Sequence, residues 1–408
     1  MHILIVHQAV VSSKEPGGTR HFEFACRLVK EGHKCTIITS ALNYLTGESG
    51  IATKKLISKE NIDGLNIIKT YTYPTLHSGF ISRIISFLSF MFTSVIAGWS
   101  VKDLHVVFGT SPPIFQAVSA WFISVLKRKP FLLEIRDLWP DFAIGIGILK
   151  NPILIRLAQW LERFLYNRAN HIIVNSPAYK ERLLGKGLEA SKISLISNGV
   201  DVRMFDPQNK GKQIREKFNL SNKFVVTYAG ALGIANDIPT ILKAAKIIQT
   251  KNSGNVHFLL VGDGNRRKEL ENLARTLNLS NVTFAGSHPK SEMPKILAAS
   301  DICVAILKDI PMFRTTYPNK VFDYMAAGRG IVLAIDGVIR KVVESASCGV
   351  FVPPGNEIAL ANAIEKFHDD KDKAYDMGLA GRNYVIQHFD RALLANKLIS
   401  LLNKYDSY

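Results

Sequence analysis

Short apolar runs, each followed by a glycine-containing loop and an amphipathic segment, constrain the fold of this chain most. Residues 3–6 (ILIV) are too few for a helix and are rich in β-branched side chains, which is typical of a buried strand. A loop with glycines follows, and then helical spacing of apolar residues over 20–30 and a second apolar run at 35–39. This order of strand, loop, helix and strand predicts a parallel βαβ unit.

The same order returns past the midpoint of the chain. A strand is predicted at 224–228 and a helix at 238–248, with a proline in its first turn where proline is tolerated. Further buried strands are predicted at 132–135, 258–261, 282–284, 302–306 and 331–334. Two doubly wound units fit this pattern better than one very large sheet. We therefore expect an α/β protein with two Rossmann-like domains at 1–198 and 224–387, joined by a polar linker at 199–223.

Composition restricts the partners of the chain. Its 408 residues are enough for two or three domains, and 51 basic against 34 acidic side chains give a net charge of +17. This excess favours an anionic partner, which leaves nucleic acid, an anionic membrane or a phosphorylated small molecule. We find no RNA-binding signature and no basic stripe interleaved with aromatic residues, so nucleic acid is not expected.

The cysteines and the N-terminus favour a cytoplasmic protein. Cys26, Cys35, Cys303 and Cys348 form no C-x-x-C pair, and no histidine cluster accompanies them, so no zinc site is predicted. Scattered cysteines suit a reducing compartment. The first residues lack the basic and long apolar regions of a signal peptide.

Two apolar stretches indicate a membrane surface or a helical core. Residues 79–100 are almost long enough to span a bilayer, but Arg83 and five serines dilute them. Residues 114–126 are also apolar and are followed by three basic residues at 127–129. A core helix, a helix lying in the membrane interface and a transmembrane helix stay open, in that order of preference.

The glycine loops of both predicted domains are candidate phosphate sites. Ligands of doubly wound sheets bind beyond the carboxyl ends of the strands, where glycines let backbone amides approach an anion. The loops contain Gly17, Gly18, Gly230, Gly233, Gly262 and Gly264. Each loop alone is weak evidence, because glycine also ends strands for structural reasons.

Residues 315–330 (TTYPNKVFDYMAAGRG) are the most informative segment. A helix is predicted to begin at Val321, so 315–320 forms the loop at its positive end. Lys320 can add a point charge for a diphosphate, and Asp323 can accept hydrogen bonds from a ribose. The alternative is an ordinary capped helix in which Asp323 complements the helix dipole.

A second chemical segment follows the predicted strand at 132–135. Arg136 and Asp137 come at its carboxyl end, where a ligand is expected. Asp137 could orient or deprotonate an acceptor hydroxyl while Arg136 lies near the phosphates. A simple ion pair between the two is the alternative.

Four motifs resemble glycosyltransferase family 4. They are NGVD at 198–201, LLVGDG at 259–264, VTFAG at 282–286 and KVFDYMAAG at 320–328, in the order typical of that family. RDLWPD and TTYPNK further resemble L-fucosaminyltransferases of O-antigen and related surface-polysaccharide synthesis. The resemblance implies a GT-B fold with two Rossmann-like domains facing a central cleft, and a retaining, metal-independent reaction. It also implies that the last stretch, 388–408, is a helix that packs back on the first domain.

The resemblance assigns roles to residues of both domains. It implies that the first domain faces the acceptor and the membrane and that the second binds the nucleotide sugar. Arg136, Asp137 and Lys320 are the expected catalytic residues. The expected donor-binding residues are Gly17, Gly18, Gly230, Gly233, Gly262, Gly264, Ser287, His288, Thr315, Thr316, Tyr317, Pro318, Asn319, Lys320 and Asp323.

The chain departs from the family pattern at four positions. Thr315 replaces the first glutamate of an E-x7-E motif, and Asp323 takes the place of the second. Ala231 stands where an arginine is usual, and Arg136 where a histidine is usual. Lys320, Arg136 or Arg314 are the candidates to supply the missing charge.

The function implied is transfer of a sugar from a UDP-sugar to a lipid-linked saccharide in O-antigen or capsule-type synthesis. An N-acetylated 6-deoxyhexose such as N-acetyl-L-fucosamine is the expected sugar, with no cofactor and no metal. The protein is expected on the inner face of the cytoplasmic membrane, attached through residues around 79–100 and 127–129. A transferase-like membrane scaffold without catalysis and a GT-B UDP-sugar 2-epimerase stay open as alternatives.

Overall fold

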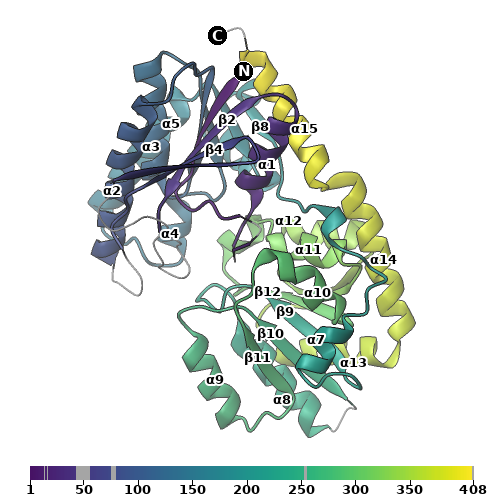
Figure 1. The fold of residues 1–408 in the computed structure, drawn as a ribbon. Helices are drawn as coiled ribbons and strands as arrows, with labels where there is room; N and C mark the ends of the chain where they lie inside the picture. The colour runs from purple at the N-terminus through teal and green to yellow at the C-terminus, as the bar shows by residue number, and fades with distance from the viewer. Residues whose placement is uncertain (13, 16, 43–55, 75–79, 252–254, 407–408) are drawn as a thin grey trace. The chain divides into compact units, whose positions relative to one another are not determined.

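The chain divides into two compact units. The computed structural model describes residues 1–408 except 13, 16, 43–55, 75–79, 252–254 and 407–408. Unit 1 comprises Met1–Ser12, Gly17–Ser197 and Ala392–Tyr408, and unit 2 comprises Ser13–Pro16 and Asn198–Arg391. Both are α/β units in which helices cover a sheet (Figure 1).

Unit 1 is built on a sheet whose strands follow the order β3-β4-β2-β1-β5-β6-β7-β8. The pairs are parallel except for β3 with β4. The strands are β1 (His2–Val6), β2 (Lys34–Ser40), β3 (Ile57–Ile62), β4 (Leu65–Thr70), β5 (Val106–Ser111), β6 (Phe131–Ile135), β7 (His171–Val174) and β8 (Ile193–Leu195). The central strands are buried throughout, as expected of a parallel sheet covered on both faces.

The helices of unit 1 include one from the end of the chain. The helices are α1 (Arg20–Lys30), α2 (Phe80–Trp99), α3 (Ile114–Lys127), α4 (Asp141–Gly145), α5 (Pro152–Arg168), α6 (Pro177–Gly185) and α15 (Arg391–Leu402), with 3-10 turns η1 (Ala190–Lys192) and η5 (Asn403–Tyr405). Leu394, Leu398 and Leu402 of α15 are buried in one cluster with Ile3 of β1 and Phe24 of α1. The end of the chain thus completes the core around its beginning.

Unit 2 has a parallel sheet of order β11-β10-β9-β12-β13-β14. Its strands are β9 (Phe224–Ala229), β10 (Val256–Val261), β11 (Val282–Gly286), β12 (Ile302–Ile306), β13 (Gly330–Ala334) and β14 (Gly349–Phe351). Its helices are α7 (Lys212–Lys217), α8 (Ile238–Thr250), α9 (Arg267–Thr276), α10 (Met293–Ala298), α11 (Asn319–Ala326), α12 (Val338–Ser345), α13 (Glu357–Asp369) and α14 (Lys371–His388), with 3-10 turns η2 (Val202–Met204), η3 (Lys290–Glu292) and η4 (Pro311–Thr315).

The segment 199–223, expected to be a linker, is instead packed into unit 2. Val200, Phe205 and Leu220 are each no more than 2% exposed and belong to the core that also holds α11. Gly211 has a positive φ of 59°, and a Cβ there would lie 2.3 Å from the backbone nitrogen of Ala299. The polar composition of the segment hid the few apolar side chains that fix it.

The predicted strands and the two predicted βαβ starts are confirmed to within two residues at their ends. Of the apolar stretch predicted at 79–100, Phe80–Trp99 form α2, and Gly79 lies outside the described residues. Among the described residues, α2 is the helix long and apolar enough to cross a membrane. One side of α2 packs on α3, where Phe90, Ser94 and Ala97 are buried. Its other side exposes Ile85, which is part of a surface described below.

Candidate active site

Two glycine loops at the carboxyl edge of the unit 2 sheet pack directly on each other. The amide of Gly230 donates to the carbonyl of Val261, and the amide of Leu232 donates to that of Asp263. A Cβ on Gly262 would lie 1.9 Å from the Gly230 carbonyl oxygen, and one on Gly264 would lie 2.5 Å from that of Leu232. Gly262 and Gly264, predicted to bind the donor, are therefore required for the close approach of the two loops.

Lys320 places its amine against the first of these loops. Its Nζ donates to the hydroxyl of Tyr228 at 2.8 Å and to Oδ1 of Asn236 at 3.1 Å, and it lies 4.0 Å from the centre of the Tyr228 ring. A Cβ on Gly230 would lie 2.7 Å from this Nζ. Burial lowers the pKa of Lys320 to about 7. No carboxylate contacts the amine among the contacts described, so it is a cation without an anionic partner.

Asp323, on the first turns of α11, is held by a lysine that the sequence did not point to. Lys290 Nζ lies 2.6 Å from both carboxylate oxygens of Asp323 and 5.7 Å from the ring centre of Phe205. Lys290 comes from η3, which follows β11, so two loops of the same sheet edge meet here. A carboxylate has about four acceptor positions, so Asp323 can still accept from hydroxyl groups.

The other expected donor residues of unit 2 are distributed around these two lysines. Ser287 is exposed after β11, and His288 Nδ1 lies 2.6 Å from Oε2 of Glu292. The hydroxyls of Thr315 and Thr316 donate to the carbonyls of Met312 and Phe313 in η4. The hydroxyl of Thr315 is thus bonded to a backbone carbonyl within its own 3-10 turn.

Tyr317, Pro318 and Asn319 lead from that turn into α11. The carbonyl of Tyr317 accepts from the amide of Asn198 at 2.8 Å, which connects NGVD to this segment. Burial raises the pKa of Tyr317 to about 12. Pro318 is the N-cap residue of α11, and Asn319 is the first, exposed residue of the helix. Arg314, a candidate replacement cation, pairs instead with exposed Asp309 at 2.9 Å.

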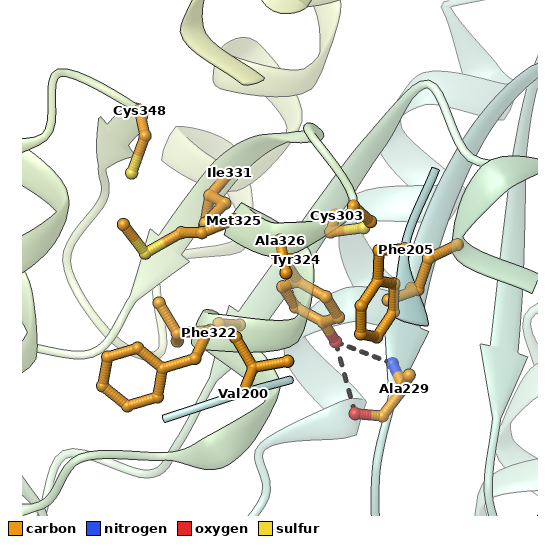
Figure 2. Close-up of a cluster of buried hydrophobic side chains, with 14 of the residues drawn as sticks. Val200, Phe205, Ala229, Cys303, Phe322, Tyr324, Met325, Ala326, Ile331 and Cys348 are labelled. Atoms are coloured by element: carbon orange, nitrogen blue, oxygen red, sulfur yellow. Dashed lines mark hydrogen bonds between the residues drawn. The ribbon is translucent and has the colours of Figure 1, made fainter. Parts of the chain in front are cut away.

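A buried tyrosine fixes α11 beneath the β9 loop. The Tyr324 hydroxyl accepts from the amide of Ala229 at 2.8 Å and donates to its carbonyl at 3.3 Å, as Figure 2 shows. Phe322 and Met325 pack in the same core. Because Val321, Phe322, Tyr324 and Met325 point inward, Lys320 and Asp323 are left to the sheet edge. The apolar pattern of this helix therefore positions both charged residues.

In unit 1, Arg136 is fixed by a histidine at the end of β1. Its NH1 group donates to Nε2 of His7 at 3.0 Å. A guanidinium can only donate, so His7 is the acceptor, and its Nδ1 lies 2.8 Å from the Thr110 hydroxyl. Burial, together with the nearby His21 and Arg136, holds the pKa of His7 well below its usual range. His7 is therefore a neutral support for Arg136.

A buried ion pair lies behind this histidine. Glu134 is fully buried, accepts from Arg20 Nε at 2.9 Å and also bonds His21. Burial alone would raise the pKa of Glu134, but Arg20 and His21 hold it well below its usual range. Burial lowers the pKa of His21 to about 4, and its ring lies 4.2 Å from that of His7. A continuous polar chain thus runs from the core to Arg136.

Asp137 follows Arg136 but does not bond it among the contacts described. Its Oδ1 accepts from the Tyr179 hydroxyl of α6 at 3.3 Å. Burial raises the pKa of Asp137 to about 6, against the opposing effects of Arg136 and Tyr179. The ion-pair alternative for Arg136 and Asp137 is therefore not favoured.

Gly17 and Gly18 precede α1, and Gly18 is exposed. Gly17 has a positive φ of 136°, and a Cβ on Gly18 would meet nothing within 4 Å. Arg20 and His21, which follow Thr19, turn inward to Glu134. The backbone is therefore accessible at Gly18.

Sequence reasoning missed Lys290, Asn236, His7, His21 and Glu134. Lys290 follows β11 and His7 follows β1, so both stand at carboxyl ends of predicted strands, which was an available signal. Glu134 lies inside a predicted strand otherwise composed of apolar residues, and a buried charge there requires partners.

Comparison with known proteins agrees with this architecture. Residues 17–203 match the model of Glycosyltransferase Family 4, and residues 210–384 match that of Glycosyl transferases group 1. The structure of HepE from Anabaena in complex with UDP and glucose superposes with a TM-score of 0.74 at 18% identity, covering 98% of this chain and 99% of that one.

Two curated relatives match part of the chain. An alpha-D-kanosaminyltransferase of Streptomyces kanamyceticus is 21% identical over 53% of this chain and 55% of its own length. A UDP-Gal:alpha-D-GlcNAc-diphosphoundecaprenol alpha-1,3-galactosyltransferase of Escherichia coli is 27% identical over 52% of this chain and 55% of its own length. The matched region spans about half the length of these two relatives.

Two parallel-sheet units of this kind, with glycine loops at the carboxyl edge of the second, define a protein of the GT-B fold class. Within that class, the chain belongs to the glycosyltransferases that combine a family 4 domain with a group 1 domain.

Proposed function

We propose that this chain transfers a sugar, with retention of configuration, from a UDP-sugar to a lipid-linked saccharide. The observation that carries the proposal is the amine of Lys320, held against Gly230 by Tyr228 and Asn236 without a carboxylate partner. A buried cation beside glycine-loop amides is suited to the diphosphate of a nucleotide sugar. Lys320 then supplies the charge that is missing at Ala231.

The reaction proceeds by exchange of one bond at the anomeric carbon. The bond from this carbon to the diphosphate oxygen breaks, and the acceptor oxygen forms its bond on the same face of the sugar. The leaving diphosphate gains charge, which Lys320 and the loop amides stabilise. The acceptor proton passes to the leaving phosphate oxygen, and Asp137 then only orients the acceptor hydroxyl; in the alternative route Asp137 takes the proton instead of the phosphate.

The ribose is assigned to Asp323. Its carboxylate is fixed by Lys290 at 2.6 Å and keeps free acceptor positions for two neighbouring hydroxyls. The base is assigned to the segment after β11, near Ser287 and His288, through backbone contacts. Thr315, whose hydroxyl bonds a carbonyl of its own turn, replaces a carboxylate beside the sugar. This replacement suits a donor sugar with fewer hydroxyl groups to be bound.

Arg136 and Asp137 of unit 1 are assigned to the acceptor and phosphate. The neutral His7 orients Arg136 without reducing its charge, so the guanidinium stays available to an anion. Asp137, whose pKa burial raises to about 6, is close to the value suited to a base near neutral pH. The amides of Gly17 and Gly18 are assigned to the diphosphate.

The relatives support the substrates in part. HepE is described in complex with UDP and glucose, and the Escherichia coli relative is named for a UDP-galactose donor and a diphosphoundecaprenol-linked acceptor. Neither the Streptomyces kanamyceticus relative nor the Escherichia coli relative is named as a fucosaminyltransferase. Transfer of N-acetyl-L-fucosamine therefore rests on the RDLWPD and TTYPNK segments. No metal is required by the mechanism proposed.

The protein is assigned to the inner face of the cytoplasmic membrane. The regions around 79–100 and 127–129 combine apolar and basic side chains, which suits an anionic bilayer and a lipid-linked acceptor. Synthesis of an O-antigen or capsule-type polysaccharide would use such an acceptor on that face.

The test is a calorimetric titration with UDP, with GDP for comparison and EDTA present. We expect UDP to bind and GDP to bind more weakly. Asp323→Ala should abolish binding, and Asp309→Ala, an exposed carboxylate of the same unit that pairs with Arg314, should leave it unchanged. No binding of either nucleotide would overturn the donor site. UDP binding without hydrolysis of any UDP-sugar would favour a scaffold that has lost catalysis, for which Thr315 is the supporting observation.

A further inference from the structure

Helix α5 of unit 1 exposes a stripe of large apolar side chains that its fold does not use. Asn151 caps the helix by accepting from the amides of Ile153 and Leu154, and Pro152 starts it. The inner face is anchored by buried residues, among them Ala158 and Leu165. The outer face carries Ile153, Leu154, Leu157 and Trp160, which are between 45% and 67% exposed.

This stripe continues onto the two neighbouring helices. The ring of Phe164 on α5 lies 4.8 Å from Trp121 of α3 and 5.7 Å from Trp160. On α3, Phe122, Val125 and Leu126 are exposed in the last two turns. The helices α2, α3 and α5 lie side by side on one face of the unit 1 sheet (Figure 1), with α3 in contact with both α2 and α5.

Helix α2 extends the same surface. Ile85, Phe92, Ile96 and Trp99 are exposed at intervals of seven, four and three residues, which places them along one side of the helix. Lys127 of α3 donates to the carbonyl of Trp99 at 2.7 Å, with its Nζ 5.7 Å from a Trp99 ring centre. We call the exposed sides of α2, α3 and α5 the three-helix face.

The charges of the three-helix face have one sign. The sequences of α2 and α3 contain no acidic residue, and the one in α5, Glu162, is buried and bonded by Lys186 at 2.7 Å. The exposed charged residues of α5 are all arginines, namely Arg156, Arg163 and Arg168. Lys127 is the last residue of α3, and the basic residues at 128 and 129 follow it. An apolar stripe flanked only by basic side chains is complementary to anionic lipid.

We infer that α5 is a membrane-anchoring helix, and that the three-helix face lies in the plane of an anionic bilayer. This inference deepens the proposed membrane location and rests on it. The apolar stripe enters the boundary between headgroups and acyl chains to about 5–10 Å, and the arginines remain at the level of the phosphates. Trp99 and Trp160 suit that boundary, where tryptophan is enriched.

The packing of the three helices argues against α2 as a membrane-spanning helix. Gly98 of α2 lies so close to α3 that a Cβ there would meet Ile123 at 2.5 Å. Phe90 and Ser94 are also buried. A helix whose inner side belongs to the core of unit 1 cannot span a bilayer without leaving that core. The three-helix face therefore lies on the membrane and does not cross it.

The experiment is flotation of the full chain with vesicles of phosphatidylcholine alone and of phosphatidylcholine with phosphatidylglycerol. We expect binding to the anionic vesicles that weakens in high salt. Leu157→Gln with Trp160→Gln should reduce the partition coefficient about tenfold or more. A matched control, Ile358→Gln with Tyr375→Gln, changes two exposed apolar side chains of unit 2 and should not alter it. UDP titration of every variant reports on folding and donor binding.

The outcomes separate the two proposals. Equal vesicle binding by the α5 variant and the wild-type protein would overturn the role of α5. Absence of wild-type binding would overturn both the three-helix face and the membrane location, whereas UDP binding would still support the transferase. A dimer that sedimentation detects in the wild type and not in the α5 variant, without vesicle binding, would assign the face to a second copy of the chain and overturn the inference.

Discussion

The charged side chains at the carboxyl edges of the two sheets differ in how they are buried and paired. In unit 2, Lys320 lies against the Gly230 loop with Tyr228 and Asn236 as its partners, and Lys290 bonds Asp323. In unit 1 the charges are embedded in the core, where Glu134, Arg20, His21 and His7 bond one another or stack before Arg136 reaches the edge.

This difference suggests that the unit 2 edge binds an anionic ligand, whereas the unit 1 network holds side chains in a fixed position. A cation without an anionic partner costs free energy until an anion arrives, so the unit 2 edge is prepared for a ligand. A buried ion pair that is already satisfied contributes a fixed geometry, and breaking it leaves an uncompensated charge. Substitutions should therefore reduce ligand affinity in unit 2 and stability in unit 1.

The largest expected effect is on the stability of unit 1. Glu134→Gln leaves Arg20 buried without its counterion, so the free energy of unfolding of unit 1 should fall by about 3–5 kcal/mol. Urea denaturation measures it. Glu60→Gln, which breaks a surface pair with Lys69, should cost about 1 kcal/mol or less. Similar losses for both variants would contradict the comparison.

Lys320→Ala should affect binding more than folding. Loss of a charged hydrogen bond to the diphosphate costs about 1.5–3 kcal/mol, or about ten- to hundredfold in the Kd for UDP. The thermal midpoint should change little, because the amine has no anionic partner to leave behind. Lys243→Ala, on the outer side of α8, should leave the Kd unchanged.

The same lysine predicts proton uptake. Since the pKa of Lys320 is lowered to about 7, the amine is mostly neutral at pH 8 and gains a proton when a diphosphate stabilises its charged form. Calorimetry at pH 8 in buffers of different ionisation enthalpy should show uptake that Lys320→Arg abolishes. Equal uptake in both proteins would assign the proton elsewhere.

Two glycines of unit 2 should behave differently from each other. Gly262→Ala places a Cβ 1.9 Å from a carbonyl oxygen and should destabilise unit 2 by about 1–3 kcal/mol or more. Gly233→Ala meets nothing within 4 Å, so stability should be retained. If Gly233 approaches the donor, only the Kd for UDP will rise. Thermal denaturation and UDP titration of the two variants distinguish these roles.

The smallest expected effect concerns Asp137. Its ionised form is lost as the pH falls through about 6, so kcat/KM should decline below that pH. The Tyr179 hydroxyl lowers this pKa, so Tyr179→Phe should shift the acidic limb of the profile to higher pH by a fraction of a unit. Asp141→Asn, a control paired with Arg182, should leave the limb in place. An unshifted limb in Tyr179→Phe would assign it to another group.

The fold was predictable because strands and helices leave periodic patterns over consecutive residues. The unit 2 site was partly predictable for the same reason, since Lys320 and Asp323 lie in one segment with the helix that positions them. Lys290 was not, because its contact with Asp323 depends on how two separate loops meet. The network of His7, His21 and Glu134 joins the end of β1, helix α1 and strand β6, which are far apart in the sequence, so no local motif predicts it.

The segment 199–223 and helix α5 show the limits of composition. The segment is polar on average, yet three buried side chains suffice to place it in unit 2. Helix α5 has enough charged residues to look like an ordinary surface helix, and only the burial of Glu162 shows that its exposed charges are all positive.

The burial of Leu394, Leu398 and Leu402 against Ile3 and Phe24 has a consequence for biosynthesis. A ribosome makes β1 and α1 before unit 2, but the helix that covers them comes from residues 391–402, after unit 2 has been made. Unit 2 can therefore mature during translation, whereas unit 1 keeps an apolar surface uncovered until residues 391–402 have been made. In the cell this nascent surface, not the finished protein, is where chaperones should bind.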